Sequence, residues 1–426
     1  MEKHMSANDI ATVVNQTITQ YLSESGEQQT KRPCSGKSFT FRSPAITVTG
    51  AYCVSQLGDT LLELGATHVL LVADKLVHQL GLVSGCEQSI TLAGIGLTLF
   101  TEVEGEPDTV IINQGIKVLK QSKADFVVGI GGGSALDAAK GMAVMIDHQG
   151  PLADLKIGGI ASRKVGLGCI PTTAGTGSET TDITVIQDLE YGIKVPVKGP
   201  ALVPDFALLD PVLMLGVPDH VTAATGIDTL THAIEAYVSR ETNPLSKAYA
   251  YHAIETVIKS LPVAVGCGDD LDMRYEMSIA AYKAGIAFSN AGLGLTHAIA
   301  HQIGAQYHIP HGVANAILLP YVMAFNALTC EKGYAELAVA MGIKVESMTQ
   351  RESCNAVIQM VRSLVQDLGL PNSLTVYNIN TGDLPQLAER AMLDICLIGN
   401  PRQVTATQIV VLLNRVLAND FPEGYC

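Results

Sequence analysis

Between Pro44 and about Pro218 the chain alternates short apolar runs with helical segments, which is the pattern of an α/β domain. His68–Ala73 is predicted to be a buried strand that ends at Asp74, and Phe126–Ile130 is predicted to be another. The first predicted domain therefore spans residues 43–218.

Beyond Pro218 the sequence becomes rich in alanine, shows helical periodicity and gives few strand signals. A helical domain is expected to begin near Asp219 and to span residues 219–426. Its amphipathic pattern is interrupted at Gly369-Leu-Pro371 and Gly399-Asn-Pro401, where we expect helices to end.

An amphipathic helix is also predicted within residues 1–22. Ile10, Val14 and Ile18 recur there at helical spacing. The segment that follows, residues 23–42, is polar and rich in helix breakers, as expected for a flexible linker. An apolar stripe shows only that the face is buried somewhere, so a targeting peptide and a helix docked on its own domain or on a dimer mate are both open.

Composition narrows the class of protein. A length of 426 residues favours two domains, and 47% hydrophobic with 16% charged residues is typical of a globular protein. The net charge of −14 argues against nucleic acid or an anionic membrane as a partner. Nine scattered cysteines without a Cys-x-x-Cys pair indicate a reducing cytoplasm. We recognise no apolar run of about eighteen residues and no secretory signal, so neither a membrane span nor secretion is expected.

The stretch from Gly226 to Gly312 concentrates groups that could bind a metal ion. Asp228 and His232 stand four apart in a run of helix formers, so both side chains should project from one helical face. Four of the eleven histidines follow within fifteen residues; they are His297, His301, His308 and His311. One carboxylate and several imidazoles suit iron(II) or zinc. The alternative is that Asp228 caps a helix and the histidines are ordinary core residues, but the two spaced pairs together favour a metal.

A second candidate site is the turn Gly131-Gly-Gly-Ser134, which connects the strand Phe126–Ile130 to a predicted helix from Ala135 to Ile146. Glycines let the backbone approach a phosphate, and Ser134 could cap the helix whose N-terminus favours an anion. The turn predicts a dinucleotide site, although a tight strand-to-helix turn without a ligand is the alternative. In an ordinary dinucleotide fingerprint the acidic residue follows the glycines by about twenty residues, whereas here Asp74 precedes them.

Three motifs resemble those of the iron-containing (group III) alcohol dehydrogenases: Gly226-Ile-Asp-Thr-Leu-Thr-His-Ala-Ile-Glu-Ala-Tyr, Gly292-Leu-Gly-Leu-Thr-His-Ala-Ile-Ala-His and Pro310-His-Gly-Val-Ala-Asn-Ala. The order of Asp74 and Gly131-Gly-Gly-Ser-x-x-Asp-x-x-Lys140 also matches this family. The resemblance runs from about Ser43 to the Asn400-Pro-Arg stretch and is greatest to the ethanolamine-utilisation enzymes. It implies the dehydroquinate synthase-like fold, in which an α/β N-terminal nucleotide-binding domain precedes an all-α C-terminal metal-binding domain.

The resemblance also assigns site residues. The metal ligands that it implies are Asp228, His232, His297 and His311, which would hold Fe²⁺ or, as an alternative, zinc. It places His301 beside the substrate and nicotinamide, where it could relay a proton. It places Asp74 at the adenosine ribose, where a carboxylate favours NAD over NADP. The implied NAD-binding residues are Asp74, Gly131, Gly132, Gly133, Ser134, Asp137, Thr172, Thr173 and Lys194.

Two positions depart from the family pattern. Glu106 precedes Pro107 where many relatives have Asn-Pro, and Asp182 replaces a usual Asn. Both add negative charge near the expected nucleotide, so NAD could bind more weakly than in the family.

The resemblance predicts an NAD-dependent alcohol dehydrogenase that interconverts acetaldehyde or propionaldehyde and its primary alcohol, with a lactaldehyde or 1,2-diol dehydrogenase as an alternative. A lyase of the dehydroquinate synthase type is a rival, but it should carry cationic groups for a phosphorylated substrate, and none lies between Gly226 and Val238. A non-catalytic scaffold should have lost metal ligands. We expect a cytoplasmic homodimer, with residues 6–22 resembling the peptides that direct enzymes to the shell or cargo of a bacterial microcompartment.

Overall fold

The computed structural model describes residues 38–148, 152–155, 160–190 and 193–422. Within it, Phe41–Cys426 forms one compact unit. The helix predicted in residues 1–22 and most of the linker predicted in residues 23–42 lie outside the described residues.

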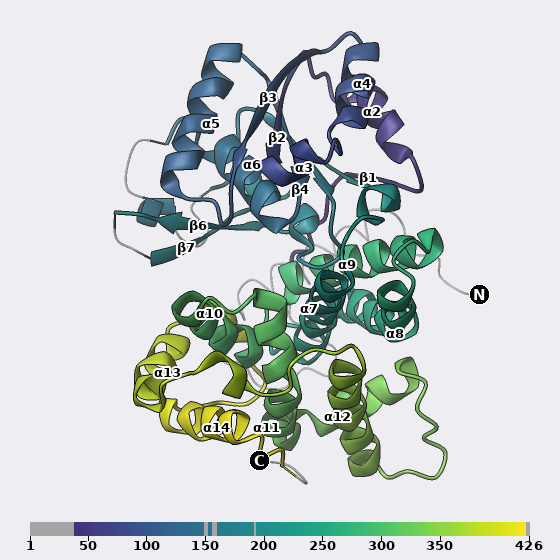
Figure 1. Ribbon diagram of the computed structural model, residues 1–426, viewed down its shortest axis with the longest axis vertical. Coiled ribbons are helices and arrows are strands. Elements are labelled where there is room, and N and C mark those ends of the chain that lie inside the picture. The colour runs from purple at the N-terminus through teal and green to yellow at the C-terminus, as the bar shows by residue number, and fades with distance from the viewer. Residues whose placement is uncertain (1–37, 149–151, 156–159, 191–192, 423–426) are drawn as a thin grey trace, which may run out of the picture. The chain divides into compact units, whose positions relative to one another are not determined.

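A six-stranded parallel sheet forms the centre of the N-terminal domain (Figure 1). Its strands are ordered β1-β8-β5-β4-β2-β3. Their bounds are β1 (Ile46–Thr49), β2 (His68–Asp74), β3 (Gly96–Val103), β4 (Phe126–Gly131), β5 (Gly166–Pro171) and β8 (Phe206–Leu209). The antiparallel hairpin of β6 (Ile183–Asp188) and β7 (Ile193–Lys198) is a separate sheet. Both strands predicted from apolar runs, at 68–73 and 126–130, are therefore confirmed.

Helices cover both faces of the parallel sheet. Alternate residues of β2 enter two different cores: Leu70 and Val72 join one, and Val69 and Leu71 join the other. A strand buried on both faces is apolar at every position, which is why β2 reads as a continuous hydrophobic run. The helices of this domain are α2 (Leu57–Glu63), α3 (Lys75–Gln79), α4 (Ser84–Leu92), α5 (Thr109–Ser122) and α6 (Gly133–Met145).

The start of α6 corrects one expectation. The N-cap of this helix is Gly132, which makes no side-chain hydrogen bond, and the helix begins two residues before the predicted Ala135. Ser134 therefore lies inside the first turn and is not the cap. Because no side chain caps this turn, its backbone N–H groups are left for an anion.

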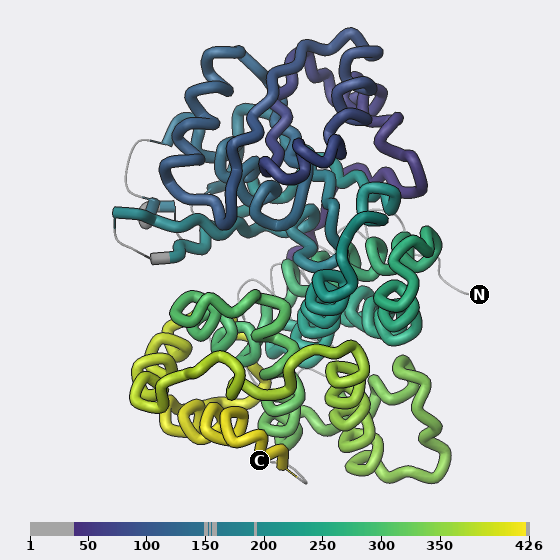
Figure 2. The backbone as a smooth tube through the Cα atoms, viewed as in Figure 1, coloured from purple at the N-terminus to yellow at the C-terminus, as the bar shows by residue number. Residues whose placement is uncertain are grey.

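The C-terminal domain is built of helices, with no strand among its described residues (Figure 2). Their bounds are α7 (Asp219–Val238), α8 (Pro244–Gly266), α9 (Leu271–Ala291), α10 (Leu295–Tyr307), α11 (His311–Ala340), α12 (Gln350–Asp367), α13 (Leu384–Met392) and α14 (Ala406–Ala418). The first of them begins at the predicted Asp219. The predicted breaks also occur, because α12 ends before Gly369, whose φ is +70°, and a 3₁₀ helix, η8 (Ile395–Gly399), ends at Gly399.

The long helix α11 contributes to both hydrophobic cores of the helical domain. It is long and apolar enough to cross a membrane, so the expectation that the chain has no such segment was wrong. However, 78% of its most apolar window is buried inside the protein. A helix that is apolar on all sides fits the centre of a large helical domain, because neighbouring helices cover every face.

Candidate metal centre and nucleotide site

Asp228 and His232 lie one turn apart on α7, as their spacing predicted, and both side chains are buried. The ring of His232 stacks on Phe288 from α9, with the ring centroids 4.4 Å apart. One helix, α7, therefore supplies two of the predicted ligands, and packing against Phe288 restricts the ring of His232.

The two remaining predicted ligands come from neighbouring helices. His297 lies in the first turn of α10, and His311 is the first residue of α11. Between these helices the chain turns at His308, which adopts a left-handed backbone conformation, and at Pro310, the N-cap of α11. This turn returns the chain towards α7, so that three helices meet at one point.

The four predicted ligands are brought together. One ligand atom from each of Asp228, His232, His297 and His311 lies within 4.8 Å of the others. From Asp228 Oδ1 to the three Nε2 atoms the distances are 3.9 Å (His232), 3.7 Å (His297) and 3.5 Å (His311). Bonds of about 2.1 Å in a tetrahedral arrangement would separate ligand atoms by about 3.4 Å, so this donor set fits a divalent ion after small adjustments.

The electrostatics of Asp228 and His232 agree with this fit. Burial alone would raise the pKa of Asp228, but the surrounding imidazoles outweigh burial and lower the pKa below its ordinary value. Burial lowers the pKa of His232 to about 4, which keeps this ring neutral. An ionised carboxylate beside a neutral imidazole is the protonation state that metal ligands require. His297 differs, because its hydrogen bonds to Asp228 and Glu235 outweigh burial and raise its pKa to about 9, so a metal ion would displace a proton from this ring.

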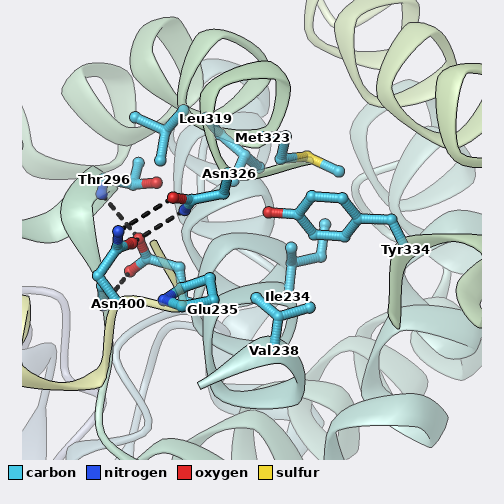
Figure 3. A pocket seen from close by; sticks show the side chains of 12 residues that line it. Ile234, Glu235, Val238, Thr296, Leu319, Met323, Asn326, Tyr334 and Asn400 are labelled. Carbon is cyan, nitrogen blue, oxygen red and sulfur yellow. Dashed lines mark hydrogen bonds between the residues drawn. The ribbon is translucent and has the colours of Figure 1, made fainter. Parts of the chain in front are cut away.

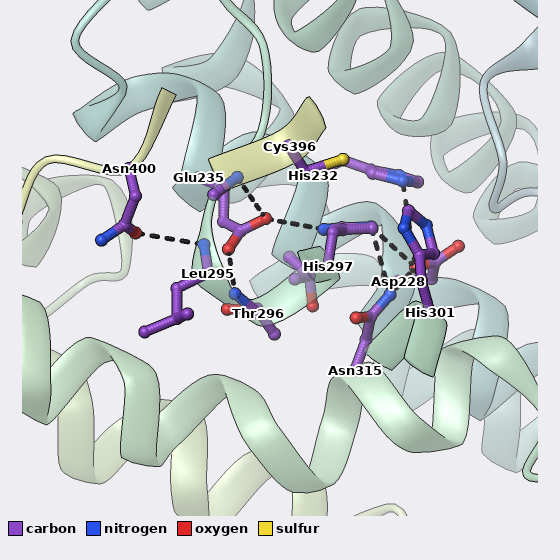
Figure 4. A network of polar contacts seen from close by, with 12 residues as sticks. Asp228, His232, Glu235, Leu295, Thr296, His297, His301, Asn315, Cys396 and Asn400 are labelled. Carbon is purple, nitrogen blue, oxygen red and sulfur yellow. Dashed lines mark hydrogen bonds and ion pairs between the residues drawn. The ribbon is translucent and has the colours of Figure 1, made fainter. Parts of the chain in front are cut away.

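Asn315, on α11, is a site residue that the sequence analysis missed. Its Nδ2 lies 2.6 Å from Asp228 Oδ1, 3.1 Å from His297 Nε2 and 3.2 Å from His311 Nε2 (Figure 4). Three of the predicted ligand atoms thus converge on one point. The available signal was its position one helical turn after His311 in Pro-His-Gly-Val-Ala-Asn.

His301 lies one turn after His297 on α10, and its side chain is about one-third exposed. Its ring stacks on His311, with centroids 5.5 Å apart, and its Nδ1 lies 2.9 Å from Asp394 Oδ2. Asp394 and Cys396, at the start of η8, complete a second group of ligand-type atoms around this histidine. Neither residue was predicted, because both lie far from the motif in sequence.

In the nucleotide domain, Asp74 and Gly131 come together at the carboxyl edge of the sheet. Their strands β2 and β4 are neighbours, with Ala73 paired to Ile130. Asp74 caps α3 by accepting a hydrogen bond from the Val77 backbone N–H at 2.8 Å. A Cβ atom on Gly131 would lie 2.8 Å from Asp74 Oδ2, and the φ of Gly131 is +149°. Glycine is therefore required where the chain turns towards α6.

Thr172 and Thr173, two more of the predicted nucleotide residues, lie in the loop after β5. The backbone N–H of Thr172 donates to Gly131 O at 2.9 Å, so the loop after β5 lies against the glycine turn. Near this turn, a Cβ on Gly132 would lie 3.9 Å from Thr173 Oγ1, and one on Gly133 would clash with Thr176.

Asp137 and Lys194 already have protein partners. The carboxylate of Asp137 accepts from Ser178 Oγ at 2.6 Å and from the Val185 backbone N–H at 3.0 Å, which fastens α6 to the loop and to β6. Lys194 forms an ion pair of 2.6 Å with Glu106. The added charge of Glu106 is therefore balanced by a lysine in the protein.

The loop after β5 contacts α7, the helix that carries two of the predicted metal ligands. Thr229 Oγ1, next to Asp228 on α7, lies 3.3 Å from the carbonyl oxygens of Ala174 and Gly175. A Cβ on Gly175 would lie 2.7 Å from Thr225 Cβ. Residues 172–175 and the four-residue cluster are therefore next to each other.

A two-domain fold of this kind, with a nucleotide turn beside an acid–imidazole cluster, suits an enzyme that uses a metal ion and a dinucleotide. Residues 44–211 match the family model of the iron-containing alcohol dehydrogenases, and residues 222–417 match the C-terminal model of the Fe-containing alcohol dehydrogenase family. The chain belongs to the iron-containing alcohol dehydrogenase family. It is an oxidoreductase of a family that uses iron and NAD as cofactors.

Among its relatives, "Probable alcohol dehydrogenase EutG" of Escherichia coli is 42% identical over 374 residues, which cover 88% of this chain and 93% of that protein. The NAD-dependent methanol dehydrogenase of Bacillus methanolicus is 34% identical over 88% of this chain and 98% of its own length. The crystal structure of a 1,3-propanediol oxidoreductase superimposes with a TM-score of 0.87 at 34% identity, covering 89% of this chain and all of that one.

Proposed function

We propose that Asp228, His232, His297 and His311 hold the iron ion, and that this site reduces a short-chain aldehyde to its primary alcohol with NADH. The observation that carries the proposal is the convergence of one carboxylate oxygen and three imidazole nitrogens beside the nucleotide loop. Bound iron supplies Lewis acidity for a substrate oxygen, and NADH supplies the hydride. Reduction consumes one hydride and one proton for each aldehyde, so the site also needs a route for the proton.

We assign the proton route to His301. Its Nδ1 contacts the Asp394 carboxylate, which can only accept a hydrogen bond when ionised, so Nδ1 carries the hydrogen and Nε2 is left to exchange a proton. The side chain is about one-third exposed, which gives the proton an exit to water.

We assign NAD to the edge of the sheet where β2 and β4 end. The uncapped first turn of α6 suits the diphosphate, and the carboxylate of Asp74 suits ribose hydroxyls and disfavours a 2′-phosphate. Gly131, Gly132, Gly133, Ser134, Thr172 and Thr173 would line this edge. Asp137 would support it through Ser178, and Lys194 would compensate charge near it.

For the substrate we propose acetaldehyde or propionaldehyde, supported by 42% identity to the EutG protein. A lactaldehyde or 1,2-diol substrate is the alternative within the same chemistry. The lyase and scaffold alternatives find no support, because the matching family consists of alcohol dehydrogenases. The protein would act in the cytoplasm as a homodimer, and residues 6–22 would attach it to a microcompartment shell or to its cargo.

Metal reconstitution tests the catalytic proposal. Protein stripped of metal is reloaded anaerobically with iron(II) or with zinc, and oxidation of NADH or NADPH is followed with acetaldehyde, propionaldehyde and lactaldehyde. Activity that returns with iron and NADH supports the proposal, and the order of the kcat/KM values identifies the substrate. No turnover with any metal or aldehyde would refute it.

A deletion tests the targeting proposal separately. Removal of residues 1–38 should leave turnover intact and abolish co-purification with shell particles. Undiminished shell association of the shortened protein would contradict this role.

A further inference from the structure

The carboxylate of Glu235 lies behind the metal centre, one turn beyond His232 on α7, and is buried. It contacts three donors: the backbone N–H of Gly294 at 3.0 Å, the backbone N–H of Thr296 at 2.7 Å and His297 Nδ1 at 2.6 Å (Figure 4). A buried carboxylate is costly unless hydrogen bonds satisfy it, and these three donors do so.

We propose that Glu235 is a positioning residue of the metal centre, which sets the orientation and tautomer of His297 and fixes the first turn of the helix that carries it. This inference rests on the proposed function, because it takes His297 as a metal ligand.

The hydrogen bond to His297 determines which ring nitrogen is free. An ionised carboxylate only accepts hydrogen bonds, so His297 Nδ1 must carry the hydrogen. In the neutral ring that a metal ligand requires, the lone pair is then on Nε2, the atom that lies 3.7 Å from Asp228 Oδ1. A carboxylate bonded to the distal nitrogen of a histidine ligand also makes the ring a stronger donor to metal.

The backbone contacts of Glu235 fix the helix. The N-cap of α10 is Gly294, which has no side chain that could cap the helix. Glu235 accepts from Gly294 and Thr296, and Asn400 accepts from the Leu295 backbone N–H at 3.1 Å. Two side chains from distant parts of the sequence therefore cap the turn that carries His297.

The space behind Glu235 leaves the carboxylate little room to move. Asn326 and Asn400 join side chain to side chain through hydrogen bonds of 2.9 and 3.0 Å, and with Glu235 they line a cavity of about 10 Å³ (Figure 3). A volume of this size is at the lower limit for a single water molecule, so no substrate could bind there. On the other side, a Cβ atom on Gly294 would lie only 2.9 Å from Glu235 Oε1.

The test is metal affinity in Glu235→Gln, measured by competition with a chelator. The amide keeps the size of the side chain and can still accept from a backbone N–H, but it lacks the charged acceptor for His297. We expect metal binding about 10- to 100-fold weaker than in the native protein. We also expect a changed absorption spectrum of bound cobalt(II), which reports on the ligands and which a purely structural role would leave unchanged.

Glu336→Gln is the matched control. Glu336 lies on α11, accepts from Tyr237 Oη at 2.9 Å and, among the described residues, makes no hydrogen bond or ion pair with the histidine cluster. The same chemical change there should leave metal affinity and the cobalt spectrum as in the native protein.

Native affinity and a native cobalt spectrum in a folded Glu235→Gln would overturn the inference. If this variant does not fold, Gly294→Ala provides the decision, because its methyl group would lie 2.9 Å from Glu235 Oε1 and 3.0 Å from Asn400 Oδ1 and would displace both groups without altering their chemistry. Metal binding should again weaken, and native affinity in folded Gly294→Ala would overturn the inference as well. Failure of the native protein to bind a metal would instead refute the proposed function.

Discussion

The proposed nucleotide site and the proposed metal centre are built by different means. At the nucleotide site the backbone is the main element: a glycine turn, an uncapped helix start and a loop that lies against the turn. At the metal centre side chains from α7, α10 and α11 converge, and further side chains hold them in place. The conformation of the glycine turn is local, whereas the side-chain cluster depends on how distant helices pack. Damage to one should therefore leave the other intact.

The largest expected effect is that of Asp228→Ala. Removing the one carboxylate of the cluster leaves imidazoles without their negative partner, so we expect metal affinity to fall on the order of 1,000-fold and turnover to be lost. Binding of NADH, followed by its fluorescence, should stay within about two-fold of the native value, which is a free-energy change below about 0.5 kcal/mol. Full activity in metal-free Asp228→Ala would refute the assignment of this ligand, and loss of NADH binding would refute the independence of the two sites.

The metal cluster and the loop after β5 each contain a buried carboxylate, and the pKa values of the two shift in opposite directions. Asp228 is surrounded by imidazoles and its pKa is lowered, whereas burial raises the pKa of Glu179, at the end of the nucleotide loop, from 4.5 to about 7. Because the folded state holds the proton of Glu179 more tightly than the unfolded state, this group lowers stability as the pH rises from about 4.5 to about 7.

Glu179→Gln should remove that dependence. Relative to the native protein, its free energy of unfolding should rise between pH 5 and pH 8 by about 2–3 kcal/mol, the size that such a shift implies. Chemical denaturation of both metal-free proteins at several pH values measures the difference. A difference between the two proteins that stays constant over this range would contradict the raised pKa.

Gly131→Ala tests the nucleotide site alone. Its φ of +149° disfavours any side chain, and the new Cβ would lie 2.7 Å from Ala135 Cβ and 2.8 Å from Asp74 Oδ2. A strained backbone of this kind costs about 1–3 kcal/mol, so we expect NADH affinity to fall by about 5- to 150-fold. Metal content, measured by elemental analysis, should not change. Gly65→Ala is the control, because it also has positive φ but nothing lies within 4 Å of the new Cβ.

The smallest effect is expected for Glu106→Gln. It releases Lys194 from an exposed ion pair, and such pairs contribute less than about 1 kcal/mol. NADH should bind a few-fold more tightly, and this gain should shrink at high salt. Affinity measured at two salt concentrations checks it, and weaker binding at both would show that the pair itself supports the cofactor.

Some features of the fold and of the proposed sites could be predicted from the sequence, and others could not. The pairing of Asp228 with His232 was predictable because helical periodicity alone puts residues four apart on one face. The glycine turn was predictable because it directly follows a buried strand. The start of α6 was misplaced by two residues, since Ser134 looks like a cap while the chain uses Gly132. The apolar helix α11 was not recognised in sequence, and burial within the fold explains its composition.

By itself, the sequence determined the order of the two domains, the strands of the nucleotide half and one half of the metal cluster, because backbone periodicity is a local property. Only the tertiary structure decided that Asp74 meets Gly131 across neighbouring strands, that Lys194 pairs with Glu106, and that Glu235 and Asp394 hold His297 and His301. These contacts join residues far apart in the chain. Their geometry is set by how the elements pack, which no local pattern encodes.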